Sequence, residues 1–247
     1  MSQTHMDDIR FRLRAIELLK VLKKRFTYEE LSKLTNLPIT VLNRYVRGHV
    51  IPSSDRANKL FKIFEKKYNI SKEIQTKIKF DDLGFFDNTF ILSDILLLRM
   101  IARLIVQRFS DLKINKILTA AVDGIPLATL VANELAVDLI FAKSSKEAGI
   151  SKYIEESYPP SSYRTLTTLY LPKHALSSKD KILIIDDVIR TGRTHQALVN
   201  MCKKAGAEVL GIFNIIGFGK RWEKNLKFDK NMNIRIETLI KIPEPTS

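Results

Sequence analysis

Residues 181–194 read KILIIDDVIRTGRT, and this stretch decides the fold that we expect for the chain. Consecutive aliphatic side chains predict a buried strand over residues 181–185, and the apolar spacing of residues 194–204 predicts a helix. Two acids, Asp186 and Asp187, stand directly where the strand is expected to end. A buried strand, a polar loop and a helix in this order are typical of one βα unit of a parallel sheet.

The two acids and the loop after them suit a phosphorylated sugar. Adjacent carboxylates such as Asp186 and Asp187 can accept hydrogen bonds from the vicinal hydroxyls of a ribose. A loop with Thr191, Gly192 and Thr194 at a helix start offers N–H groups, hydroxyls and the positive end of a helix dipole to a phosphate. The alternatives are a cation site made from two acids, or acids that only cap the next helix. The flanking strand and helix favour the ribose phosphate.

Further apolar runs extend this unit in both directions along the chain. Buried strands that alternate with amphipathic helices predict an α/β fold with a mainly parallel sheet. Ligands of such sheets bind beyond the carboxyl ends of the strands. The expected strands and helices cover residues 116–122, 126–136, 138–142, 164–171, 181–185, 194–204, 208–216 and 234–240.

A second loop stands at the same expected edge of the sheet. Asp123 and Gly124 follow the first strand of this region and precede a helix that opens with Pro126. Glycine permits a close approach of the backbone, and a helix N-terminus again favours an anion. A strand, a glycine and a proline before a helix usually form only a turn, so this loop is a weak signal alone.

Positive charge is concentrated in the first third of the chain. The whole chain has a net charge of +14, and residues 1–79 account for +10 of it, with 18 basic and 8 acidic side chains. Such a balance favours a polyanionic partner, although a solvated lysine-rich surface explains charge alone equally well. Among the regular elements expected here, helix one covers residues 8–24. Thr27 and Glu30 form a capping box that starts helix two.

A third short helix is expected over residues 39–47, after a break at Pro38. Its apolar side chains share one face, which leaves Thr40, Asn43, Arg44 and Arg47 on the opposite side. Arginine can bond to guanine edges and asparagine to adenine, and a helix of this length fits a major groove. The alternative is an ordinary helical hairpin with a solvated basic face.

The chain is therefore expected to divide into a helix-turn-helix DNA-binding domain over residues 1–70, a polar connector over residues 71–88 and a ligand-binding domain over residues 89–247. Cys202 is the single cysteine, which excludes an internal disulfide and a zinc cluster. No signal peptide or membrane-spanning stretch is evident, so we expect a cytoplasmic protein. The four histidines share no metal-ligand spacing, and no metal ligand is assigned.

The stretch 182–194 resembles the phosphoribosyl pyrophosphate motif of the type I phosphoribosyltransferases. The resemblance implies that Asp186 and Asp187 bind the ribose hydroxyls and that the loop binds the 5-phosphate through Arg190, Thr191, Gly192, Arg193 and Thr194. Arg190 and Arg193 depart from the small residues common there. Residues 120–135 resemble the pyrophosphate loop of the same family, which implies a role for Asp123 and Gly124. Lys143 stands at the base of a segment, 144–164, that corresponds to the family's mobile loop.

Residues 27–60 resemble the helix-turn-helix of phage repressors and Cro proteins, which implies base or phosphate contacts for Thr40, Asn43, Arg44 and Arg47. The order of these motifs is similar to that of archaeal helix-turn-helix regulators with a phosphoribosyltransferase-like domain. The bacterial purine-operon repressor is similar, because it also joins a DNA-binding domain to a phosphoribosyltransferase-like domain.

These resemblances imply a transcriptional regulator, active as a homodimer on double-stranded operator DNA. Its effector would be phosphoribosyl pyrophosphate, bound with Mg²⁺, or a related nucleotide. An active phosphoribosyltransferase for a purine, xanthine or orotate is the main alternative, and an RNA-binding attenuator is a weaker one. The segment 144–164 lacks the catalytic signature of an orotate enzyme, so no catalytic residue is assigned.

Overall fold

The computed structural model describes residues 4–82, 85–159, 166–226, 228 and 232–244. The chain divides into two compact units, Met1–Thr76 and Lys77–Ser247. No helix among the described residues is both long and apolar enough to cross a membrane.

The first unit is entirely α-helical. Thr27 begins the second helix with the expected capping box, because its side chain accepts a bond from the Glu30 backbone and the Glu30 carboxylate accepts one from the Thr27 backbone. Asn36 ends that helix in the left-handed conformation, with φ of 54°. The helices of the first unit are α1 (His5–Lys23), α2 (Tyr28–Thr35), α3 (Ile39–Val46), α4 (Ser54–Lys67) and α5 (Ile70–Lys77).

The core of this unit is made by apolar side chains from its first four helices. Leu19, Leu31, Leu42, Ala57 and Leu60 are all buried. The hydroxyl of Tyr45 accepts a hydrogen bond from the guanidinium of Arg56 at 2.9 Å. Packing on one face of α3 leaves the opposite face of this short helix to solvent.

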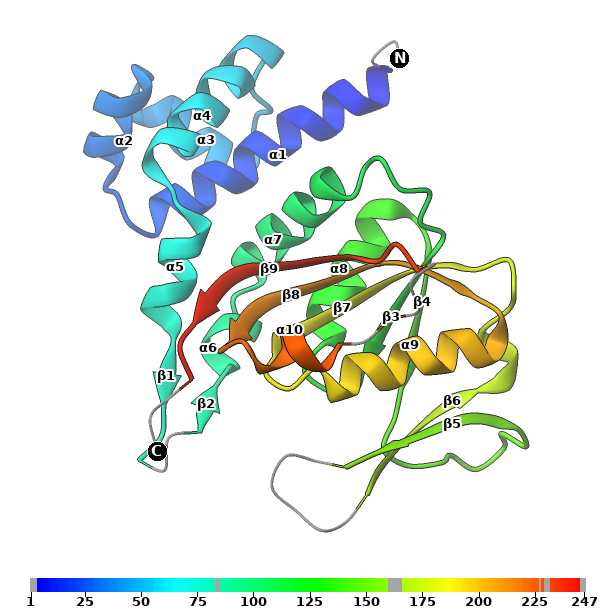
Figure 1. Ribbon diagram of the computed structural model, residues 1–247. Coiled ribbons are helices and arrows are strands. Elements are labelled where there is room, and N and C mark those ends of the chain that lie inside the picture. Colours follow the sequence, from blue (N-terminus) through cyan, green and yellow to red (C-terminus); the bar gives the residue numbers. More distant parts are fainter. Residues whose placement is uncertain (1–3, 83–84, 160–165, 227, 229–231, 245–247) are drawn as a thin grey trace. The chain divides into compact units, whose positions relative to one another are not determined.

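The second unit is built on the parallel sheet that the sequence predicts. Its strand order is β4-β3-β7-β8-β9, and every neighbouring pair is parallel. Helices α7 and α8 cover one face and α9 covers the other (Figure 1). The strands are β3 (Lys116–Ala120), β4 (Asp138–Ala142), β7 (Lys181–Ile189), β8 (Glu208–Phe218) and β9 (Arg235–Ile242). The helices are α6 (Thr89–Leu92), α7 (Ile95–Arg108), α8 (Ile125–Leu135), α9 (Arg193–Ala205) and α10 (Arg221–Asn225).

Three sequence expectations differ from the structure. The apolar run 164–171 is wrong as a sheet strand, because β6 (Thr167–Pro172) pairs antiparallel with β5 (Tyr153–Tyr158) in a separate hairpin. Only alternate side chains of β6 are buried, as in a strand with one covered face. β5 also lies within the segment expected to be a mobile loop, of which residues 160–165 lie outside the described residues.

The region expected as a polar connector contains regular structure. Residues 71–77 belong to α5, and an antiparallel ladder follows, formed by β1 (Lys79–Phe80) and β2 (Phe86–Asp87). Each of these strands has two residues, too few for an apolar periodicity to be visible in the sequence.

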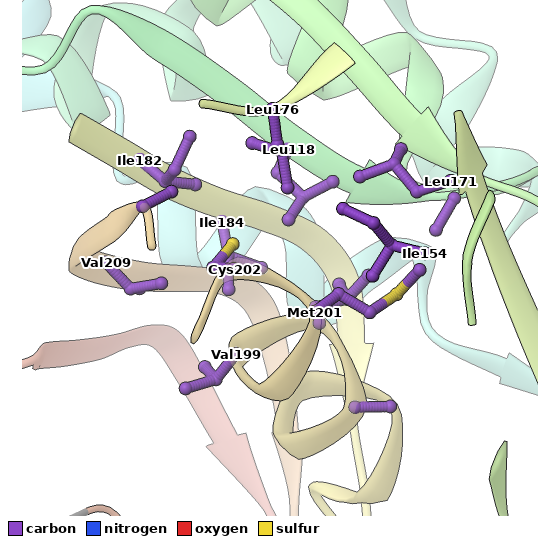
Figure 2. Close-up of a cluster of buried hydrophobic side chains, with 14 of the residues drawn as sticks. Leu118, Ile154, Leu171, Leu176, Ile182, Ile184, Val199, Met201, Cys202 and Val209 are labelled. Carbon is purple, nitrogen blue, oxygen red and sulfur yellow. The ribbon is translucent and has the colours of Figure 1, made fainter. Parts of the chain in front are cut away.

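A continuous apolar core joins α9, the sheet and the β5–β6 hairpin (Figure 2). Met201 and Cys202 from α9 meet Ile184 from β7 in this cluster, while Ile154 and Leu171 enter it from the hairpin. Burial of each such side chain contributes roughly 1.5–3 kcal/mol to stability. The hairpin is thus packed onto the helix that begins at the loop after β7.

Candidate functional site

The carboxyl end of β7 carries the two acids, Asp186 and Asp187. Both lie in the sheet, and each is only 8% exposed. Burial, reinforced by the charge of Asp187, raises the pKa of Asp186 well above its usual range. Burial also raises the pKa of Asp187, against the effect of a hydrogen bond from Asn88. The protein therefore places two desolvated carboxyl groups where hydroxyl donors of a ligand would compensate their burial.

Gly124, at the start of α8, lies beside Asp186. A Cβ atom added to Gly124 would lie 2.0 Å from Thr119 Oγ1 and 2.8 Å from Asp186 Oδ1, so no other residue fits without displacement. Asp123 beside it is exposed, and its charge contributes to the raised pKa values of both acids. The structure thus brings the two loops of the sequence analysis together at one edge of the sheet.

The loop between β7 and α9 is fixed by Gly192. This glycine has φ of +76°, in the left-handed region that favours glycine, and caps the N-terminus of α9. A Cβ atom there would lie 3.0 Å from the side chain of Leu226. Asn225 donates to the backbone carbonyl of Thr191 at 3.0 Å. These contacts fix the N-terminus of the 13-residue helix α9 directly after the strand that carries the acid pair, and a helix N-terminus favours an anion.

On the first unit, three of the four expected reader side chains are exposed. Thr40, Arg44 and Arg47 lie on one side of α3 and the residue that ends it. Asn43 differs, because it is half-buried and its Oδ1 is covered without a hydrogen-bond partner among the described residues.

Comparison with known proteins identifies the second unit. A family profile described as the phosphoribosyl transferase domain matches residues 91–247. The chain belongs to this family. Its fold is that of the type I phosphoribosyltransferases, with the parallel five-stranded sheet described above.

Relatives of this phosphoribosyl transferase domain include both enzymes and regulators. A xanthine phosphoribosyltransferase from Clostridium tetani is 34% identical over 148 residues, which are 59% of this chain and 77% of that protein. A probable purine biosynthesis transcriptional regulator PurR from Streptococcus pneumoniae is 25% identical over 173 residues. This match spans 68% of this chain and 62% of the regulator.

Solved structures share the fold of this domain. The adenine phosphoribosyltransferase from Thermoanaerobacter pseudethanolicus matches with a TM-score of 0.62 and 20% identity, over 70% of this chain and 99% of that one. The Trypanosoma brucei enzyme, solved with AMP, pyrophosphate and ribose-5-phosphate, matches with a TM-score of 0.62 and 22% identity.

The two arginines of the phosphoribosyl transferase motif contact other elements of the chain. The Arg190 guanidinium lies over the ring of Phe218, 4.5 Å from its centroid. Arg193 donates to the backbone carbonyl of Pro159 at 2.6 Å. Their length allows these side chains to reach neighbouring elements, whereas the small residues usual at these positions cannot.

Thr194 and Lys143 are also engaged by other parts of the chain. The hydroxyl of Thr194 lies 3.0 Å from that of Tyr158 at the end of β5. Lys143 forms an ion pair with Glu147, and both line a cavity of about 200 Å³ between β4 and the hairpin. The resemblance implies a place for Lys143 with the ligand loops, whereas none of the residues that line this cavity belongs to the loops at residues 121–126 or 190–194.

Sequence reasoning missed four polar side chains around the acids and the loop: Asn88, Tyr158, His195 and Asn214. Asn88 donates to Asp187 Oδ2 at 2.7 Å from far away in the sequence. His195 and Asn214 are buried together, with Nε2 and Oδ1 2.6 Å apart, and His195 Nε2 lies 3.7 Å from Asp186 Oδ2. No local pattern in the sequence predicts the contact of Asn88 with Asp187, because the two residues lie 99 positions apart.

Proposed function

We propose that this protein is a DNA-binding transcriptional regulator whose phosphoribosyl transferase unit senses phosphoribosyl pyrophosphate or a related nucleotide. The observation that carries the proposal is the combination of two features on one chain. One unit holds a desolvated acid pair on the strand that leads into the N-terminus of α9, and the other presents Arg44 and Arg47 on the exposed side of a short helix and at its end.

The ligand half of the proposal follows from the chemistry of the site. Asp186 and Asp187 would accept hydrogen bonds from the ribose hydroxyls, and residues 190–194 would hold the 5-phosphate. Asp123 and Gly124 would face the diphosphate. The described residues contain no group of three or more His, Cys, Asp or Glu side chains that could hold a metal ion. Mg²⁺ would therefore arrive with the diphosphate and take only one or two carboxylates from the protein.

The DNA half rests on α2, α3 and the turn between them. Two eight-residue helices joined through the left-handed Asn36, with an apolar face packed inward, support a helix-turn-helix of the Cro type. α3 would lie in the major groove, where Thr40, Asn43, Arg44 and Arg47 would contact bases or phosphates. Because Asn43 is half-buried, we propose the two arginines as the main readers.

The assembled regulator would be a cytoplasmic homodimer of the kind found in archaea. We propose DNA-binding and ligand-binding domains over residues 1–70 and 89–247, joined by residues 71–88. A two-fold symmetric pair of α3 helices would read a palindrome with half-sites about 34–36 Å apart, or a multiple of this spacing. The effector must prefer one of two conformations to change operator affinity.

A working phosphoribosyltransferase for xanthine, another purine or orotate is the second candidate. The 34% identity to a xanthine phosphoribosyltransferase favours it. Transfer at C1 requires the base and the diphosphate to be positioned and charged groups to be preorganised around them. Lys143 forms an ion pair with Glu147, and no catalytic residue is assigned to this candidate.

The two candidates are separated by one pair of assays on the full chain. Genomic fragments are selected with the protein at about 150 mM salt, where non-specific binding to phosphates is weak, with and without phosphoribosyl pyrophosphate and Mg²⁺. Turnover is measured in parallel against a panel of bases. Enrichment of a palindrome without turnover supports the regulator, and turnover without enrichment supports the enzyme.

A further inference from the structure

Asn88 joins the segment after the first unit to the ligand-binding acids. Its side-chain N–H donates to Asp187 Oδ2 at 2.7 Å, across 99 positions of sequence. Asp87 Oδ1 accepts from the Thr89 backbone at 2.9 Å, which fixes the turn that presents Asn88. The donor lowers the pKa of Asp187 against the effect of burial, so it favours the ionised form of that carboxyl group.

The same segment is attached to the end of β8 through aromatic rings. Phe80 and Phe86 are partners in the β1–β2 ladder. Their ring centroids lie 6.1 and 5.4 Å from that of Phe218, over which Arg190 is stacked. The segment therefore contacts the site region at two points, Asp187 and Phe218, and the Arg190 guanidinium lies over the ring of Phe218.

We infer that Asn88 is a residue of the ligand site and that it transmits occupancy of that site to the segment leading from the first unit. The inference rests on the proposed function. An asparagine amide has a second N–H and a carbonyl oxygen, so Asn88 can hold Asp187 and still bond to a ribose hydroxyl. A bound ribose phosphate would thus add hydrogen bonds to a side chain that already donates to Asp187.

Chain connectivity gives this contact its regulatory consequence. The first unit ends at Thr76, and the end of α5 and the β1–β2 ladder lie between it and Asn88 in the sequence. A ligand that bonds to Asn88 would stabilise one arrangement of this short segment. A ligand shifts an equilibrium only by its difference in affinity for the two states, and Asn88 supplies such a difference.

The test uses the full chain, with phosphoribosyl pyrophosphate plus Mg²⁺ and ribose 5-phosphate as probes. Calorimetric titration of Asn88→Ala is expected to show a roughly tenfold loss of affinity for both, the effect of a hydrogen bond to a charged group. The Asn88→Asp variant is expected to lose more affinity, because it places a further carboxylate against Asp187. Asn115→Ala is the matched control, because its side chain bonds to residues 179 and 181 at the opposite end of β7.

Hydrogen exchange gives an independent second readout that needs no DNA. Either probe should increase the protection of the amides of residues 86–92 in the wild-type protein, and this increase should disappear in Asn88→Ala. Wild-type affinity of Asn88→Ala for both probes would overturn the role of Asn88 while leaving the proposed function intact. A retained protection increase would overturn the transmission. Wild-type protein that binds neither probe would overturn the ligand site itself, and this inference with it.

Discussion

His195 Nε2 lies 2.6 Å from Asn214 Oδ1, and both side chains are buried directly behind the acid pair. Asn214 stands opposite Asp186 in the β7–β8 register, so the pair links the first turn of α9 to the strand beside the acids. Burial lowers the pKa of His195 to about 4, against the effect of the Asn214 bond. The imidazole is therefore neutral at physiological pH.

Because folded His195 is neutral, the free energy of unfolding should depend on pH in the acid range. In the unfolded chain a histidine binds a proton near pH 6.5, whereas folded His195 does so near pH 4. Stability should fall as the pH drops from 6.5 to 4, by about 3 kcal/mol in total. His195→Gln removes this loss, so the difference in unfolding free energy between wild type and variant should shrink across that window. Denaturant unfolding checks this, and His49→Gln, which alters an exposed histidine, should leave the slope unchanged.

Asp186→Asn should stabilise the free protein and abolish ligand binding. The folded pKa of Asp186 is raised, so its contribution to stability is full below the unfolded pKa and is lost as the pH rises through the folded value. The asparagine has no charge to desolvate, so we expect a melting temperature a few degrees higher at pH 8 and a smaller gain at pH 4. Thermal denaturation at both pH values measures this effect. A lower melting temperature at pH 8 would contradict the assignment of a desolvation cost to Asp186.

Tyr158→Phe tests whether the β5–β6 hairpin supports the phosphate loop. The lost hydroxyl lies 3.0 Å from Thr194 Oγ1, and one neutral hydrogen bond is worth about 0.5–1.5 kcal/mol. Affinity for ribose 5-phosphate should fall two- to tenfold by calorimetry. Tyr153→Phe is the control, because Tyr153 lies on the same hairpin but its hydroxyl bonds to the backbone of Glu147, before β5. Equal losses in both variants would mean a general effect on the hairpin.

Gly192→Ala should damage both stability and phosphate binding. Alanine pays about 1–2 kcal/mol for a left-handed conformation, and its Cβ would also meet Leu226 and Trp222. Gly149→Ala separates these effects, because Gly149 has φ of +89° but no atom within 4 Å of an added Cβ. We expect denaturant unfolding to show a larger loss for Gly192→Ala. Equal losses would show that crowding at the loop is unimportant.

Arg44→Ala and Arg47→Ala should weaken operator binding, by about 1–3 kcal/mol where the arginine contacts a base. If the arginine contacts a phosphate, its replacement should instead reduce the slope of log affinity against log salt concentration by about one. Fluorescence anisotropy over a salt series distinguishes these roles. Ligand affinity should not change, and Lys72→Ala in α5 removes an equal charge as a control. Unchanged operator affinity in both arginine variants would exclude α3 as the reading element.

Much of the fold follows from local sequence signals. The strand at residues 138–142 coincides with β4, and the capping box at Thr27 forms as expected, because both depend on neighbouring residues only. β6 shows the limit of this reasoning. Its apolar run resembles that of a sheet strand, but the partner it finds is the nearby β5, and pairing is not encoded in one strand alone.

The site was less predictable than the fold. Asp186 and Asp187 stand out because strand, acids and loop are contiguous in sequence. Asn88 reaches Asp187 only through the tertiary fold, and no local pattern announces such a contact. The ion pair of Lys143 with Glu147 is local, yet its place in a separate cavity depends on how the hairpin packs beside β4.

The central claim is that one ligand at the acid pair changes operator affinity. The most direct measurement is anisotropy of a selected operator fragment, titrated with wild-type protein and with Asp186→Asn, with and without phosphoribosyl pyrophosphate and Mg²⁺. We predict that the ligand shifts the operator affinity of the wild-type protein at least fivefold, as allosteric couplings typically do. The variant should bind the operator without responding. A wild-type protein that binds the ligand while its operator affinity stays constant would contradict the account.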